Sequence, residues 1–136
     1  EALFRQANQR YADSDFAGAS QALKQAYELE PIATLLYSRA QVERRQEHWR
    51  EAAKLYQAYL DTGPPDEETV HARRHLLFSS SQAARVEGNC EEAVPLYDRY
   101  LEEYPGAAQA EDARVGREAC RETLALAAGQ EPGPPG

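Results

Sequence analysis

Two histidines lie four residues apart in a helical stretch, a spacing with which two imidazoles can hold a metal ion. His71 and His75 are separated by an alanine and two arginines. The arginines would repel a cation, and no glutamate stands between the histidines to act as a catalytic base. We therefore expect no metal site and interpret the pair as part of a solvated helix face. His48 lies in a predicted turn, with no partner evident from the sequence.

No other residues have the types and spacing of a catalytic site. No serine or cysteine stands in a nucleophile motif, and no glycine-rich loop is present that would cradle a phosphate. Gly88-Asn89 is typical of a turn, and paired acids such as Glu91-Glu92 are typical of an exposed helix face. We expect no catalytic residue, no cofactor and no enzyme activity in this stretch.

The composition predicts a helical protein and argues against nucleic acid as its main partner. The 15 Lys and Arg residues against 23 Asp and Glu residues give a net charge of −8, which argues against a nucleic-acid partner. Alanine is frequent whereas Val, Ile and Thr are scarce, which favours helices over sheets. No apolar run approaches the roughly 18 residues of a membrane span. The chain has neither an initial Met nor a basic-then-apolar leader, so we expect a fragment or a mature product.

One pattern occurs three times along the chain. Three alanines and three prolines follow one another at intervals of 33 and then 41 residues: Ala19, Ala52 and Ala93, and Pro31, Pro64 and Pro105. Further small residues recur one helix earlier, where helices would cross closely: Ala7, Ala40 and Ser81. A shared period of this length predicts stacked helical units.

The pattern resembles the tetratricopeptide repeat, in which about 34 residues form two helices. The resemblance covers roughly residues 1–105 and implies an all-α, right-handed α-α superhelix (a solenoid) with three helix pairs. The repeats would occupy about 1–31, 32–64 and 65–105, and a closing helix with a polar outer face would occupy 107–128. Residues 1–128 would thus form the domain, and the Pro/Gly-rich residues 129–136 a tail or linker. The sequence departs from the family where the usual glycine before the second helix survives only as Gly88.

Caps and helix breakers set the expected helix limits. We expect helices at about 1–13, 16–29, 33–46, 49–61, 66 to 86 or 87, 90–103 and 107–128. Asp15 and Asn89 are placed to cap the second and sixth helices, and prolines follow the ends of the second and fourth. The fifth helix is about two turns longer than its counterparts, which accounts for the longer second interval.

In this family the first helix of each pair lines a concave groove that selects the ligand. The resemblance places ten side chains there: Phe4, Asn8, Tyr11, Tyr37, Gln41, Arg44, Arg45, Phe78, Gln82 and Arg85. The equivalent amides of Asn8, Gln41 and Gln82 would suit an extended peptide backbone, and Tyr37 and Phe78 would be apolar anchors. The three arginines would bind carboxylates of a partner, or would instead pair with nearby glutamates: Glu43, Glu47 and Glu87. The chaperone-tail clamp of one family variant is matched only at Asn8, so we expect no such ligand.

Cys90 and Cys120 lie at neighbouring ends of two antiparallel helices in such a stack. A disulfide between them would close a loop of 31 residues and contribute about 3–4 kcal/mol, and it would favour a periplasmic or other extracytoplasmic location. The alternative is two buried reduced thiols, since Cys90 is equivalent to Phe16 and Trp49.

The sequence therefore predicts a non-catalytic interaction module that holds a peptide or protein segment, with acidic partners one option. It is expected to be monomeric, although self-association through the convex face or the long fifth helix stays open. Two alternatives also stay open: an assembly component of the bacterial envelope, and a regulatory domain of a larger enzyme or signalling protein.

Overall fold

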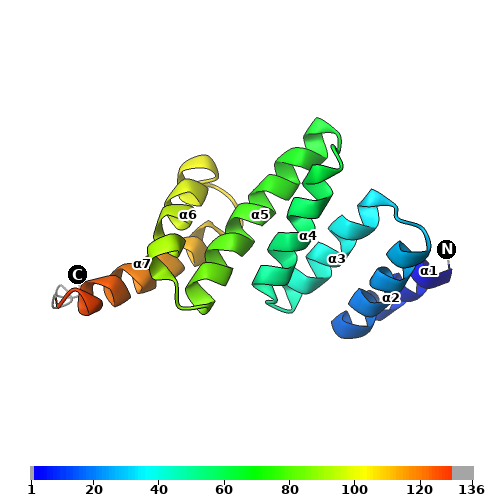
Figure 1. Ribbon diagram of the computed structural model, residues 1–136, viewed down its shortest axis with the longest axis horizontal. Coiled ribbons are helices and arrows are strands. Elements are labelled where there is room, and N and C mark those ends of the chain that lie inside the picture. The colour runs from blue at the N-terminus through cyan, green and yellow to red at the C-terminus, as the bar shows by residue number, and fades with distance from the viewer. Residues whose placement is uncertain (1, 130–136) are drawn as a thin grey trace. The chain divides into compact units, whose positions relative to one another are not determined.

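The computed structural model describes residues 2–129, and these residues form seven α-helices and no strand (Figure 1). The helices are α1 (Ala2–Ala12), α2 (Phe16–Leu29), α3 (Ala33–Arg45), α4 (Trp49–Asp61), α5 (Asp66–Val86), α6 (Cys90–Glu103) and α7 (Ala110–Ala127). The predicted all-α class, with three helix pairs and a closing helix, is confirmed. Apart from Gly129, the predicted linker lies outside the described residues.

The helix limits agree closely with those expected from caps and breakers. Four of the helices, α2, α4, α5 and α6, have the expected first and last residues. The closing helix was expected from residue 107 but begins at Ala110, because the residues after Pro105 form successive turns. The oxygen of Asp15 accepts from the backbone N–H of Gly18 over 3.0 Å, and that of Asn89 accepts from Glu92 over 3.3 Å. Both predicted caps are therefore confirmed.

The three turns inside the helix pairs have one backbone geometry. At equivalent positions the chain adopts a positive φ: Ser14 (61°), Glu47 (60°) and Gly88 (80°). The next residue in each turn then donates its N–H back to the preceding helix over 2.7 to 3.0 Å: Asp15 to Arg10, His48 to Glu43, and Asn89 to Ala84. The glycine that the sequence lacks in the first two repeats is thus replaced by residues in the left-handed conformation.

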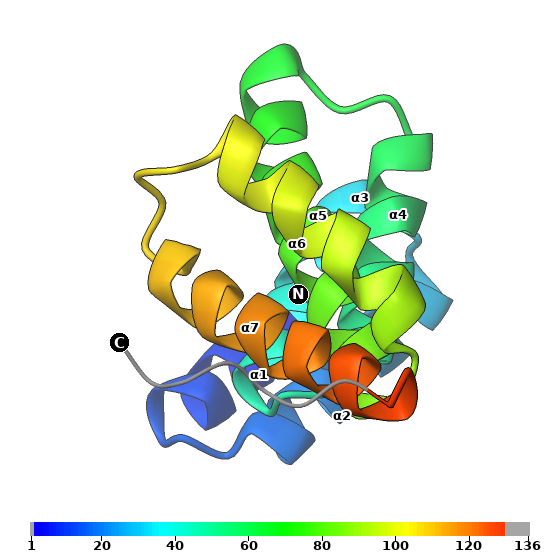
Figure 2. The same ribbon diagram turned by 90° about the vertical axis from the view of Figure 1, so that its left-hand side faces the viewer.

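Two compact units make up the chain, and the division falls within α5, between Ser79 and Ser80. In unit 1, which ends at Ser79, α2 packs against both α1 and α3, and α3 packs against α4. In unit 2, which begins at Ser80, α6 and α7 lie side by side (Figure 2).

Residues that share the repeat period form the core. The six small residues expected at helix crossings are exposed by 2% or less: Ala7, Ala19, Ala40, Ala52, Ser81 and Ala93. Larger residues at a second set of equivalent positions are also buried: Leu23, Tyr56 and Tyr97. Small side chains let the helices approach closely while the larger ones fill the space beside them.

A disulfide links α6 and α7 in unit 2. Cys90 is the first residue of α6, and its Cα lies 5.0 Å from that of Cys120 in α7. Neither described cysteine is a free thiol. The bond fixes the start of one helix to the other within this unit.

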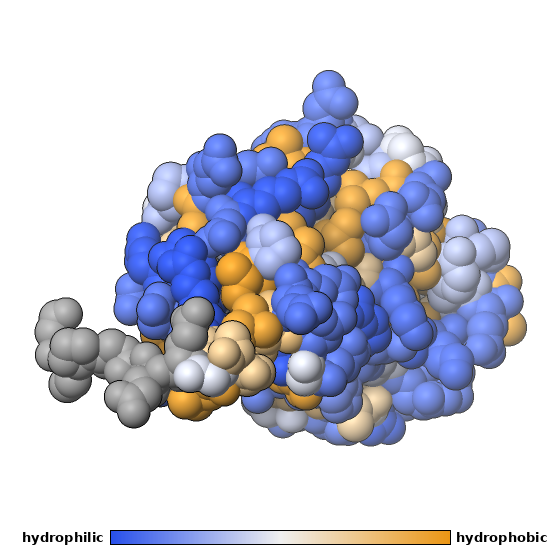
Figure 3. Space-filling model, turned by 60° about the vertical axis from the view of Figure 1, so that its left-hand side comes forward, coloured by the Kyte–Doolittle hydropathy of each residue, from blue (hydrophilic) through white to orange (hydrophobic). Residues whose placement is uncertain are grey.

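The face drawn in Figure 3 is mostly hydrophilic, with apolar residues exposed in smaller areas between hydrophilic ones. Of the large apolar side chains that the structure describes, Leu29 is the most exposed, at 79%. None of the described helices combines the length and the apolar character needed to cross a membrane.

Candidate functional site

A pocket of about 220 Å³ opens in unit 1 between α1 and α3, and a side chain of α2 forms part of its wall. We call it the polar pocket; its lining residues are Ala7, Asn8, Tyr11, Leu23, Ser38, Gln41, Val42 and Arg44. Four of the ten side chains predicted for the groove therefore meet here: Asn8, Tyr11, Gln41 and Arg44.

Helical periodicity explains why these side chains share one pocket. Asn8 and Tyr11 are three residues apart on α1, and Ser38, Gln41 and Arg44 follow one another at the same spacing on α3. Residues three apart lie on one face of a helix. Between these polar groups the pocket has an apolar floor, because Ala7, Leu23 and Val42 are buried. Each carboxamide offers a donor and an acceptor, so the pocket presents two such pairs to a ligand.

Arg44 is positioned by a tyrosine of the neighbouring helix. Its Nε donates a hydrogen bond to the hydroxyl of Tyr56 over 3.2 Å. Burial raises the pKa of Tyr56 to about 12, and the positive charge of Arg44 opposes part of that rise. Within the described residues Arg44 forms no ion pair, so the pairing with a nearby glutamate considered from the sequence is not observed for it. The Nη groups at the tip of this guanidinium keep four N–H donors for a ligand.

Unit 2 repeats the same arrangement. The Nε of Arg85 donates to the hydroxyl of Tyr97 over 2.9 Å, and that hydroxyl donates to the side-chain oxygen of Gln82. Burial raises the pKa of Tyr97, while Arg85 lowers it. Gln82 is buried, so its amide oxygen supports the core of unit 2. Of the three predicted amides, Asn8 and Gln41 therefore meet in one pocket, whereas Gln82 is buried in unit 2.

The other predicted groove residues lie elsewhere. The ring of Tyr37 packs against those of Tyr56 and Tyr59 at centroid distances of 5.7 and 5.2 Å. The guanidinium of Arg45 lies over the ring of Phe16, 5.8 Å from its centroid.

Phe78 and Phe4 have opposite surroundings. Phe78 is only 3% exposed and packs edge-on against Trp49, so it offers no open ring to a ligand. Phe4 is 39% exposed and lines a second pocket.

This second pocket, of about 360 Å³, also lies in unit 1. We call it the apolar pocket; its lining residues are Leu3, Phe4, Ala26, Leu29, Glu30, Ile32, Thr34 and Leu35. Apolar side chains dominate the wall, and among the described residues Glu30 is its one ionisable group. Of this set only Phe4 was predicted from the sequence. Leu3 lies beside it on α1, and the other six residues come from the end of α2, the start of α3 and the turn between them.

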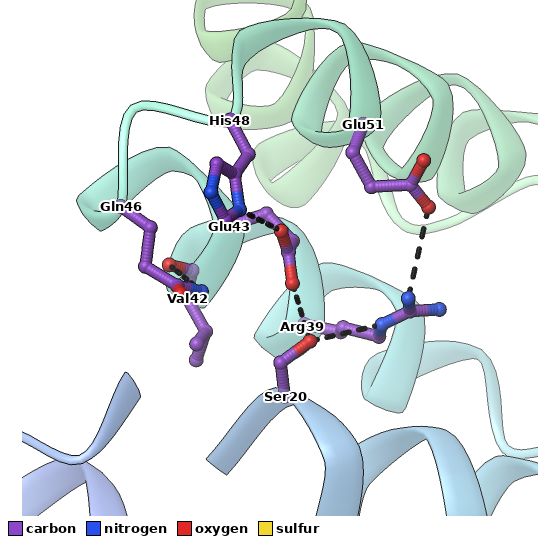
Figure 4. A network of polar contacts seen from close by, with 7 residues as sticks. All are labelled: Ser20, Arg39, Val42, Glu43, Gln46, His48 and Glu51. Atoms are coloured by element: carbon purple, nitrogen blue, oxygen red, sulfur yellow. Dashed lines mark hydrogen bonds and ion pairs between the residues drawn. The ribbon is translucent and has the colours of Figure 1, made fainter. Parts of the chain in front are cut away.

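A buried carboxylate connects α2, α3 and the start of α4 (Figure 4). Glu43 is 7% exposed, accepts a hydrogen bond from the hydroxyl of Ser20, and lies 2.7 Å from Nδ1 of His48. Arg39 donates to the same serine over 3.2 Å and extends to Glu51 at 3.7 Å. Because three helices contribute, this network fixes their packing beside the polar pocket.

No partner of His48 was evident from the sequence, and Glu43 is that partner in the structure. A signal was present in the sequence: Arg10 and Asp15 have the same five-residue offset in the first repeat and form an ion pair at 2.7 Å. Both pairs close the same kind of turn. The basic residue comes first in one pair and the acidic residue comes first in the other.

The histidine pair on α5 has two different environments. Nδ1 of the exposed His71 lies 3.2 Å from the guanidinium of Arg74. His75 is half-buried and stacks on the ring of Tyr56 at 5.4 Å. Burial, assisted by the nearby positive charge of Arg44, lowers the pKa of His75 to about 4. The predicted solvated face is thus correct for His71 and wrong for His75. No group of three metal-ligating side chains occurs among the described residues.

Comparison with known proteins agrees with the geometry. Residues 4–67 match the family model of the tetratricopeptide repeat. This stretch covers α1 to α4 and contains every residue of the two pockets except Leu3. No curated protein matches the chain.

Proposed function

Because residues 4–67 match the family model of the tetratricopeptide repeat, a family whose repeats mediate interactions between proteins, we propose that the polar pocket binds an extended segment of a partner protein. The family is typically non-catalytic, so the pocket would bind and release its ligand unchanged. Stacked helices hold the pocket walls in place before the ligand arrives, and little ordering entropy is lost on binding.

The observation that carries this proposal is the set of contacts that Arg44 makes. Its guanidinium is held in the pocket wall by Tyr56, yet within the described residues it pairs with no carboxylate. In a chain with a net charge of −8, an arginine without an ion pair beside two amides favours a ligand that supplies a carboxylate. Such a charge-assisted contact contributes about 1.5–3 kcal/mol.

The amides of Asn8 and Gln41 would bind the ligand backbone. An extended peptide exposes both N–H and C=O groups, and a carboxamide can satisfy one of each. The hydroxyls of Tyr11 on α1 and Ser38 on α3 add one further partner on each wall. The pocket would thus recognise backbone through its amides and an acidic side chain, or a terminal carboxylate, through Arg44.

Selection from a random peptide library tests the proposal. The immobilised chain is used to select 12-residue peptides displayed on phage, and one enriched peptide is labelled and titrated by fluorescence anisotropy. The double variant Asn8→Ala/Gln41→Ala removes two neutral hydrogen bonds of about 1 kcal/mol each, so affinity should fall at least tenfold. Arg44→Gln should weaken binding to a similar extent, and Arg44→Lys less.

Gln25→Ala is the matched control, because Gln25 is exposed on α2 and lies outside both pockets. Its affinity should stay within twofold of the wild type. Circular dichroism on each variant separates loss of binding from loss of fold. Equal affinity for the double variant and the control would contradict the proposal.

We also propose that the protein acts in an oxidising compartment, such as the bacterial periplasm or the cell exterior. The disulfide between Cys90 and Cys120 supports this, since persistent disulfides are rare in reducing compartments. Protein alkylated at the moment of cell lysis, then unfolded without reductant, should show no reactive thiol at either position. Two alkylated cysteines would contradict this location.

A further inference from the structure

The polar and apolar pockets lie between the same helices. Each is lined by α1, α2 and α3, and no residue of another helix contributes to either. On α1 the apolar pocket takes Leu3 and Phe4, and the polar pocket takes Asn8 and Tyr11 one and two turns later. The two pockets are therefore successive stretches along one set of helices.

The helical register makes them one continuous groove. Phe4, Asn8 and Tyr11 are spaced by four and three residues on α1, and Thr34, Ser38 and Gln41 have the same spacing on α3. Such residues form a single stripe along one helix face. Across α2, Leu23 lines the polar end and Ala26 the apolar end, and these two residues are also one turn apart. The residues that line the two pockets thus follow one another along the same faces of α1, α2 and α3.

The two ends of this groove differ in chemistry. The apolar end exposes Leu29 at 79% and Ile32 at 45%, far more than a side chain serving only the core would expose. The polar end holds Arg44 without an ion pair among the described residues. Glu30 stands at the apolar end, so a carboxylate placed there would be repelled. The charges therefore orient an acidic ligand with its carboxylate at the polar end.

We propose that the groove takes one extended segment of a partner protein that carries a large apolar side chain and a carboxylate three residues apart. This inference rests on the proposed function and adds the partner's chemistry and spacing to it. The apolar side chain fills the end formed by Phe4, Leu29 and Ile32, and the carboxylate meets Arg44.

The spacing follows from helix and strand geometry. The centres of the two pockets are separated by five to seven residues along α1 and α3, which at 1.5 Å per residue is about 8–11 Å. An extended chain advances about 3.3 Å per residue, so about three residues cover that distance. Neighbouring residues would be too close together, and a separation of six would overshoot the groove.

A peptide series tests the spacing directly. Labelled peptides of identical composition carry one leucine and one aspartate, separated by one, three or six positions in an alanine and serine background, in both chain orders. The separation of three should bind at least fivefold more tightly than the other two in one of the orders. Affinities that do not depend on the separation would overturn the inference.

Variants at the apolar end separate this inference from the proposal on which it rests. Leu29→Gln should weaken the best peptide at least fivefold. The same change at Leu126, a leucine of α7 in unit 2 that is 56% exposed, should leave affinity within twofold. If Leu29→Gln behaves like Leu126→Gln while Asn8→Ala/Gln41→Ala still weakens binding, the apolar end is not used and only the proposed function stands. If the amide double variant also binds normally, both proposals fail.

Discussion

Gly116 packs directly against the ring of Tyr97: a Cβ atom at Gly116 would lie 2.5 Å from the tyrosine hydroxyl oxygen and 2.6 Å from Cζ. Tyr97 is fully buried, and its hydroxyl is held by Arg85 and Gln82. The ring therefore has no space into which it could move. This contact explains a glycine in the middle of α7, where glycine is otherwise unfavourable.

We predict that Gly116→Ala destabilises the protein by about 1–2 kcal/mol. Overpacking costs about 1–3 kcal/mol, and the better helix propensity of alanine returns part of this. Urea denaturation followed by circular dichroism measures the change. Gly106→Ala is the control, because nothing lies within 4 Å of a Cβ at that position. An unchanged midpoint for Gly116→Ala would show that Tyr97 can move aside.

A second prediction concerns the left-handed turn residue Glu47. It has a φ of 60°, close to the 80° of its equivalent Gly88, and this conformation costs a residue with a Cβ about 1–2 kcal/mol. Glu47→Gly should raise the free energy of unfolding by about 0.5–1 kcal/mol after the entropy cost of glycine. Glu47→Ala, which removes the side chain but keeps the strain, should give no gain. Equal stabilities of the two variants, measured by urea denaturation, would exclude relief of backbone strain as the cause.

The fold was predictable because its determinants are local and repeated. Asp15 and Asn89 cap their helices through bonds within three residues, and the alanine period marks the helix crossings. Residues 107–109 were predicted to be helical but precede α7. Some of these turn residues, such as Ala107 and Ala108, are also good helix formers.

The site was predictable only where helical register decides it. Asn8 and Gln41 reach one pocket because both belong to the inner face of a first helix. Other contacts depend on how neighbouring helices pack, which the repeat period of the sequence does not determine. Examples are the burial of Phe78 against Trp49 and the hydrogen bond from Arg44 to Tyr56. The apolar pocket was missed because much of its wall comes from the end of α2 and the turn after it, whereas the resemblance places ligand contacts on the first helix of each pair.

A third prediction tests the buried carboxylate of Glu43. Glu43→Ala removes the acceptor of the Ser20 hydroxyl and the partner of His48, and it leaves a cavity among three helices. The expected cost is about 2–3 kcal/mol. Glu43→Gln keeps an acceptor for Ser20 and should cost less than half as much. Thermal and urea denaturation of both variants provide the measurement; a Gln variant as unstable as the Ala variant would make charge, not hydrogen bonding, the dominant contribution.

The matched test of the exposed partner is His48→Ala. The side chain of His48 is 57% exposed, so solvent screens its interaction with Glu43 and its removal should cost about 1 kcal/mol or less. A fall of more than 2 kcal/mol in the free energy of unfolding would show that this histidine stabilises the start of α4 more than its exposure implies.

The last prediction is a pH dependence of stability that originates at His75. Its pKa is about 4 in the folded protein, because of burial first and then the charges of Arg44 and Arg74, against about 6.5 in the unfolded chain. Between these two values the unfolded state binds the proton and the folded state does not. Stability contributed by neutral His75 is therefore complete above pH 6.5 and is lost as the pH falls toward 4.

Between pH 7 and pH 5 this group should lower the free energy of unfolding by about 1 kcal/mol, after allowance for its partial exposure. His75→Gln should abolish that part of the pH dependence, whereas His71→Gln, at the exposed histidine one turn earlier, should retain it. Urea denaturation of the three proteins at pH 7 and pH 5 measures the difference. Because carboxylates titrate equally in all three, any difference between the variants belongs to the histidines. An identical loss in His75→Gln and wild type would mean that His75 is protonated in the folded protein at pH 5, with its stacking on Tyr56 intact in the charged form.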